Sequence, residues 1–199
     1  MEFIKKFILD KIRLVQLLLL FSFALTGISI TKDYGISYDE LEYRQQGFVV
    51  LNYIGEKLFP EKTKKIIEKR DINFPKIDEY MGELPNNFKI QHTFYSLLEY
   101  IFFEDSKKDE VFYFRHYINF LISLISLFLF YKTLRINFDR TISSLGGIAF
   151  ILSPRIFADF FYSPNDIWSL FFLICCLYCI FNFLNKKKIK YFYCLSFFV

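Results

Sequence analysis

The sequence lacks the short motifs that identify many soluble enzymes. It contains no glycine-rich phosphate loop, no H-E-x-x-H pair and no N-glycosylation sequon, and it shows no internal repeat. Histidine is scarce, with two residues in 199, and the four cysteines have no histidine near them in the chain. These absences give no support to nucleotide-binding, zinc-protease or repeat architectures.

The sequence is instead rich in apolar residues, which make up 54% of the chain and gather in long runs. This is the composition of a membrane protein. The formal net charge of +4 is small and indicates no nucleic-acid-binding patch. The cysteines lie within or at the start of apolar runs, so we interpret them as packing residues rather than metal or redox ligands.

The apolar runs predict an all-α, polytopic membrane protein with four complete spans and the start of a fifth. A basic, apolar N-terminus also resembles a signal peptide, but the further spans favour an uncleaved first helix. The spans are expected at about residues 12–31, 111–131, 141–153, 167–185 and 191–199.

The charges between the spans predict the orientation of the chain. The N-terminus and the connections 132–140 and 186–190 carry net charges of +2, +2 and +4, so the positive-inside rule places them in the cytoplasm. The loops 32–110 and 154–166 then face outward together. The long loop is expected to contain amphipathic surface helices near 41–59 and 92–103, with a charge-rich helical stretch at 62–70.

Two adjacent acids, Asp39 and Glu40, follow the first span in the stretch G-I-S-Y-D-E-L. One interpretation is structural, because Ser37 and Glu40 have the spacing of a capping box and acids stabilise a helix N-terminus. The other interpretation is catalytic, with the two carboxylates held at a membrane face. The stretch by itself leaves both open.

The second outer loop places more charges at the same face, namely Arg155, Asp159 and Asp166. Charged residues close to hydrocarbon usually face a cavity or one another. Structural alternatives exist here too. Arg155 and Asp159 have the spacing of an ion pair on one helix turn, and Asp166 can cap the helix that follows.

Together these features resemble the N-terminal part of the GT-C membrane glycosyltransferases, in the branch that contains protein O-mannosyltransferases and aminoarabinose transferases. The resemblance rests on the basic start, the first span, the D-E pair, the large outer loop, the R-H at the head of the second span, and S-P-R-I-F-A-x-x-F-Y-x-P-x-D-I in the second outer loop. Proteins of this family are longer, so the chain is expected to be an N-terminal part of such an enzyme.

The resemblance implies a transferase that moves a sugar from a polyprenyl-phosphate donor to an acceptor hydroxyl with inversion. Asp39 matches the acid of the family's first outer loop, which would act as general base or metal ligand, and Glu40 matches its neighbour. Asp166 matches the acid of the second loop. His92 departs from the family's H-x-P-L segment because the proline is missing.

Negative charge develops on the leaving phosphate, and the candidate groups to bind it are Arg155, Arg115 and His116. Alternatively, Asp39 and Asp166 share a divalent metal such as Mg²⁺ or Mn²⁺ that bridges to the phosphate. The sequence does not choose between these arrangements.

The expected partners are a polyprenyl-phosphate-linked sugar and the lipid bilayer, with no nucleic acid and an acceptor that the sequence does not define. The expected location is a bacterial inner membrane, with the N-terminus cytoplasmic and the site facing the periplasm. The alternatives are an ion- or proton-coupled transporter and a non-catalytic accessory subunit. Transporter sites usually lie near the middle of the membrane between repeats, whereas these acids gather at one face.

Overall fold

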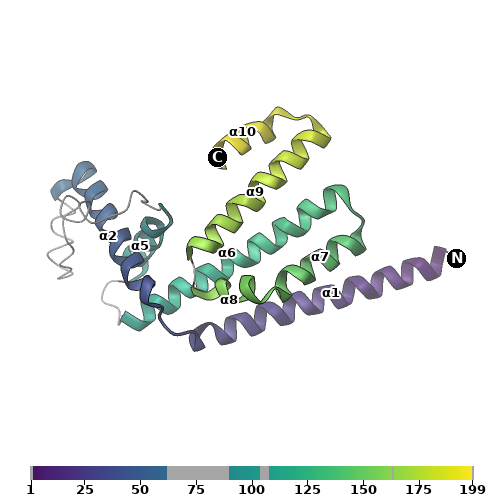
Figure 1. Ribbon diagram of the computed structural model, residues 1–199, viewed down its shortest axis with the longest axis horizontal. Helices are drawn as coiled ribbons and strands as arrows, with labels where there is room; N and C mark the ends of the chain where they lie inside the picture. Colours follow the sequence, from purple (N-terminus) through teal and green to yellow (C-terminus); the bar gives the residue numbers. More distant parts are fainter. Residues whose placement is uncertain (1, 62–89, 104–107, 163, 199) are drawn as a thin grey trace. The chain divides into compact units, whose positions relative to one another are not determined.

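The computed structural model describes residues 2–61, 90–103, 108–162 and 164–198, and every regular element in these ranges is a helix. The prediction of an all-α protein is confirmed. In chain order the elements are α1 (Glu2–Ile30), the 3₁₀ helix η1 (Thr31–Asp33), α2 (Tyr38–Leu58), α5 (Ile90–Phe102), α6 (Lys108–Asn137), α7 (Arg140–Leu152), α8 (Pro154–Tyr162), α9 (Pro164–Lys186) and α10 (Ile189–Phe198) (Figure 1).

The chain divides into two compact units. The first, which we call the helical core unit, consists of Met1–Tyr34 and His116–Val199, and the second, the inserted unit, consists of Gly35–Arg115. The inserted unit corresponds closely to the first outer loop predicted at 32–110, with the first turns of α6 added.

Aromatic side chains form the centre of the helical core unit. Phe23 of α1 packs against Phe120 of α6, with ring centroids 5.7 Å apart, and Phe120 stacks on Phe161 of α8 at 5.4 Å. A β-carbon at Gly27 would overlap the ring of Phe120, so glycine allows α1 and α6 to approach closely. Phe160 and Phe161 have no exposed surface. This cluster joins three helices that are far apart in the sequence.

Two described helices are long and apolar enough to cross a membrane: residues Glu110–Asn137 of α6 and Pro164–Lys186 of α9. They correspond to the spans predicted near 111–131 and 167–185. With 28 and 23 residues, they extend about 42 and 35 Å, compared with a hydrocarbon core of about 30 Å. The chain is therefore an integral membrane protein.

A third candidate is bent. Helix α7 ends at Leu152, next to the Ser153-Pro154 stop that the sequence predicts, and α8 begins at once, so that the two helices meet at 64°. The pair is one broken span or a re-entrant hairpin. The sequence predicted loop structure from residue 154 onward, but α8 forms because proline is well suited to the first position of a helix and its aromatic residues are buried.

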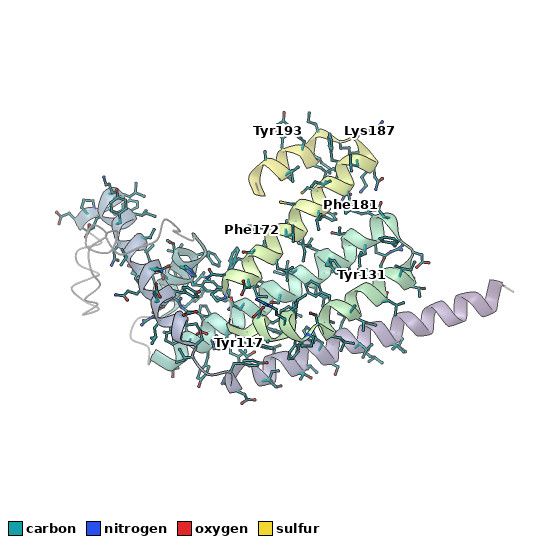
Figure 2. The ribbon with its side chains drawn as sticks, in the orientation of Figure 1. Tyr117, Tyr131, Phe172, Phe181, Lys187 and Tyr193 are labelled. Carbon is teal, nitrogen blue, oxygen red and sulfur yellow. The ribbon has the colours of Figure 1, made fainter. Side chains whose placement is uncertain are left out.

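The prediction of four complete spans and the start of a fifth is not confirmed, since the described residues provide two spans, or three if the bent pair counts as one. Helix α7 has only 13 residues, and α10 has 10, about half of a span. Helix α10 packs back on α9 after a turn in which Lys187 has a φ of 49° (Figure 2). In α1, the side chains of residues 2–13, 16 and 17 lie outside the described residues, so its role as a span stays a prediction.

In the inserted unit, α2 and α5 pack against each other, and they occupy the two stretches predicted as amphipathic helices. The helices cross at Gly47, where a β-carbon would overlap the main-chain carbonyl of His92 and the hydroxyl of Ser96. Phe48, Val49 and Tyr95 are almost completely buried around this crossing. The predicted helical stretch at 62–70 lies outside the described residues.

Candidate functional site

The two adjacent acids lie in the first turn of α2 and have different environments. The carboxylate of Glu40 accepts a hydrogen bond from the main-chain N–H of Ser37 at 3.4 Å, and its residue is only 5% exposed. Asp39 is exposed to solvent. The capping-box interpretation therefore holds for Glu40, whereas the carboxylate of Asp39 is accessible for chemistry.

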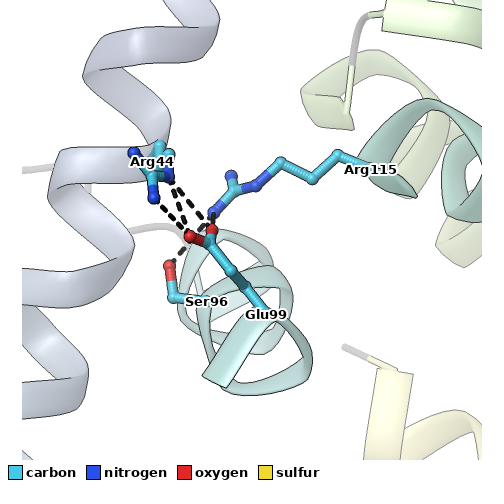
Figure 3. Close-up of polar contacts among 4 residues, drawn as sticks. All are labelled: Arg44, Ser96, Glu99 and Arg115. Carbon is cyan, nitrogen blue, oxygen red and sulfur yellow. Dashed lines mark hydrogen bonds and ion pairs between the residues drawn. The ribbon is translucent and has the colours of Figure 1, made fainter. Parts of the chain in front are cut away.

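Near this turn, a polar cluster joins three helices of the inserted unit (Figure 3). The guanidinium of Arg44, on α2, forms a bidentate ion pair with Glu99 of α5, with Nε lying 3.0 and 3.1 Å from the two carboxylate oxygens. Arg115 of α6 donates to the same carboxylate at 3.1 Å and to the hydroxyl of Ser96 at 3.3 Å. We call these four residues the arginine–glutamate cluster.

This cluster carries a net charge of +1, because two guanidiniums share one carboxylate. The side chains of Glu99 and Arg115 are 4% and 8% exposed, so the charges have little access to water. Aromatic rings complete the surroundings: Arg115 lies 5.7 Å from the centre of Tyr95, and Arg44 lies 5.6 Å from that of Phe48.

The cluster changes how Arg115 can be interpreted. One terminal nitrogen of its guanidinium is engaged by Glu99 and Ser96, and the arginine is largely buried. Its partners were not among the residues predicted from the sequence. Glu99 did carry a signal, because it is the one acidic residue of α5, a helix with no lysine or arginine.

The two histidines are buried, each with 1% exposure, and they belong to different units. His92 of α5 stacks on Tyr43 of α2 with ring centroids 4.4 Å apart and an interplanar angle of 12°. His116 lies on α6, one turn before Asn119, whose amide donates to the main-chain carbonyl of Phe161 at 3.4 Å. His116 thus lies where α6 is held against α8.

The charges of the second outer segment gather on α8 and the start of α9. Arg155 is 90% exposed, and its Nε lies 4.0 Å from the carboxylate of Asp159, as the four-residue spacing predicted. Asp166 is exposed in the first turn of α9 and interacts electrostatically with Asp159. Two acids and one arginine therefore share this part of the helical core unit.

The predicted site residues fall into two groups. Asp39, Glu40 and Arg115 belong to the inserted unit, whereas His116, Arg155 and Asp166 belong to the helical core unit. A metal shared by Asp39 and Asp166 therefore stays a prediction. In the described part of the chain, no group of three or more histidine, cysteine or acidic side chains is arranged to hold a metal ion.

Comparison with known proteins finds a family match for one part of the chain. Residues 109–199, which extend from the start of α6 through α10, match the family described as dolichyl-phosphate-mannose-protein mannosyltransferase. No curated protein and no solved structure matches the chain. The matched residues include His116, Arg155 and Asp166, and the family in general uses a polyprenyl-phosphate-linked sugar as donor. Over these residues the chain is similar to a family of membrane glycosyltransferases, which agrees with the GT-C resemblance described from the sequence.

Proposed function

We propose that the protein transfers a sugar from a polyprenyl-phosphate donor to an acceptor hydroxyl at the outer, periplasmic face of a bacterial inner membrane. The observation that carries this proposal is the family match over residues 109–199. The segment α8–α9 lies inside the match and brings Arg155, Asp159 and Asp166 together. A phosphate-linked donor requires a cation to bind its phosphate, and a hydroxyl acceptor requires a carboxylate to accept its proton.

In the proposed reaction, Asp39 is the general base. The acceptor oxygen attacks the anomeric carbon as its proton passes to the carboxylate of Asp39. The bond between the anomeric carbon and the phosphate oxygen breaks, and its electron pair leaves with the lipid phosphate. A single displacement inverts the anomeric centre. The exposure of Asp39 supports this role, whereas Glu40 holds the helix turn beside it.

For the leaving phosphate, the proposal assigns Arg155 the main role. Its side chain is 90% exposed, and its Nε lies 4.0 Å from the carboxylate of Asp159, which is a long distance for an ion pair. Arg115 is already engaged by Glu99, so it contributes positive potential rather than a free pair of donors. His116 is buried at the α6–α8 contact, and we assign it a positioning role.

The decisive experiment measures sugar transfer in membranes that contain the protein, with a polyprenyl-phosphate-sugar pool, for wild type and Asp39→Asn. We expect Asp39→Asn to lower transfer by at least 100-fold, because loss of a general base typically costs 10²–10⁴-fold. Asp33→Asn is the matched control, since Asp33 is also exposed and lies six residues earlier. Membrane insertion is measured for each variant.

Unchanged transfer by Asp39→Asn would refute the assignment of the base. No transfer even by wild type would favour a transporter or an accessory subunit. The same assay with a metal chelator tests the alternative in which Asp39 and Asp166 share a divalent metal such as Mg²⁺ or Mn²⁺. Loss of transfer that added metal restores would support it.

A further inference from the structure

An apolar groove lies between α1, α6 and α7 in the helical core unit, at a place that the proposed reaction does not use. Its cavity volume is about 520 Å³, within the range of small-molecule sites. The walls are mainly leucine, isoleucine and phenylalanine side chains, including Leu20, Phe128 and Ile148. A groove of this kind accepts a hydrocarbon chain.

One end of the groove is basic. Lys132, near the end of α6, and Arg140, at the start of α7, both line it and are both exposed. Neither forms an ion pair with a carboxylate among the described residues, while the Nζ of Lys132 lies 5.3 Å from the ring centre of Phe128. The acid of this turn, Asp139, accepts a hydrogen bond from Ile142 at 2.8 Å as the helix cap. Two cations therefore remain for an outside anion.

This basic end is far from the point where α6 contacts α8, the helix that carries Arg155 and Asp159. Asn119 marks the point where α6 contacts α8, and Lys132 follows it by 13 residues on the same helix. At 1.5 Å per residue, the two points are about 20 Å apart along α6. The basic end of the groove is therefore separate from the point where α6 contacts α8.

We propose that this groove binds an anionic membrane phospholipid, with one acyl chain along the apolar walls and the phosphate between Lys132 and Arg140. Apolar walls that end in two unpaired cations are complementary to an amphiphile with a negative headgroup. Basic pockets between membrane helices on the cytoplasmic side are a recognised type of anionic-lipid site. The positive-inside rule predicts that the turn at 132–140 lies on that side.

The test uses the purified full chain in detergent with phosphatidylglycerol and phosphatidylcholine of equal chain length, and it measures bound lipid by native mass spectrometry. We expect wild type to retain at least five times more phosphatidylglycerol than phosphatidylcholine. Lys132→Gln/Arg140→Gln should lose most of this preference. Lys187→Gln/Lys188→Gln, which removes two exposed positive charges from the turn between α9 and α10, should keep it.

A second variant tests the apolar part of the site without changing any charge. Gly147 lines the groove, and a β-carbon there would lie in ordinary contact with Leu127 at 4.0 Å, so Gly147→Leu should place its side chain in the groove. We expect it to reduce phosphatidylglycerol binding at least five-fold with helix content unchanged.

Three results would overturn the proposal. The first is equal retention of the two lipids by wild type, and the second is an equal loss in both charge-removal variants. The third is displacement of phosphatidylglycerol by glycerol 3-phosphate as readily as by a short-chain phosphatidylglycerol. That result would show that the site binds anions and that the apolar groove does not bind an acyl chain.

Discussion

At the scale of single residues, Glu99 is buried between two arginines of the inserted unit. Its carboxylate compensates two guanidiniums, and its side chain is 4% exposed. Glu99→Gln keeps the size of the side chain but leaves the buried guanidinium of Arg115 and the partly exposed guanidinium of Arg44 without their shared carboxylate. Breaking a buried ion pair by removing one partner typically costs about 3–5 kcal/mol.

We therefore expect Glu99→Gln to lower the free energy of unfolding of the protein by about 3 kcal/mol. Thermal unfolding in detergent, followed by circular dichroism, measures this loss. Glu42→Gln is the matched control, because Glu42 is exposed on α2, where it accepts a hydrogen bond from Gln46 at 3.0 Å. A loss no larger than that of the control would show that the cluster does not stabilise the fold.

Substitutions of the two acids of α2 should have different effects, one on the stability of the protein and the other on sugar transfer. Glu40→Ala removes a buried cap and should lower the free energy of unfolding by about 1 kcal/mol. Asp39→Ala removes an exposed carboxylate and should change it by less than about 0.5 kcal/mol while it abolishes transfer. Denaturation and transfer are measured on the same preparations, and a large loss of stability in Asp39→Ala would contradict this division.

Local sequence patterns predicted several residue-level features well. The capping-box spacing found the role of Glu40, and the four-residue spacing found the pair of Arg155 and Asp159. The ion pair of Arg44 and Glu99 was not predicted, because its members are 55 residues apart. No local pattern specifies which distant charges meet when two helices pack.

At the scale of secondary-structure elements, the crossing of α2 and α5 depends on Gly47. A methyl group there would overlap the carbonyl of His92, which is main chain and cannot turn aside. We expect Gly47→Ala to lower the free energy of unfolding by about 1–3 kcal/mol, the usual cost of overpacking. Thermal unfolding measures it, with Gly35→Ala as control because a methyl group at Gly35 meets no neighbour within 4 Å. Equal stability of the two variants would show that α2 and α5 do not cross closely.

The existence and the type of most elements were predictable from the sequence, but the helical structure of α8 was not. The sequence stop at Ser153-Pro154 indicated a break, and we interpreted the following residues as a loop. In the structure the proline starts a new helix, because Phe160 and Phe161 gain burial by packing on α6 and α1. Proline marks a boundary, but tertiary packing decides whether a loop or a helix follows it.

At the scale of the whole molecule, the predicted orientation can be tested directly. In a background with all native cysteines replaced by alanine, Arg155→Cys lies at the start of α8, which precedes α9, and Lys187→Cys directly follows the end of α9. Both positions are exposed. A membrane-impermeant maleimide added to intact cells with a permeable outer membrane should label Arg155→Cys. It should label Lys187→Cys only after the inner membrane is opened. The reverse pattern would invert the proposed topology.

The pair of Arg44 and Glu99 has a further consequence, for the length of chain between them. These two residues are 55 positions apart in the sequence, and their contact brings both ends of the intervening chain together. The entropy of closing a flexible loop grows only with the logarithm of its length, so doubling the loop costs about 0.6 kcal/mol. The ion pair of Arg44 and Glu99 holds α2 and α5 together at this point. The number of residues between Arg44 and Glu99 can therefore change considerably while the entropic cost of bringing these two side chains together changes little.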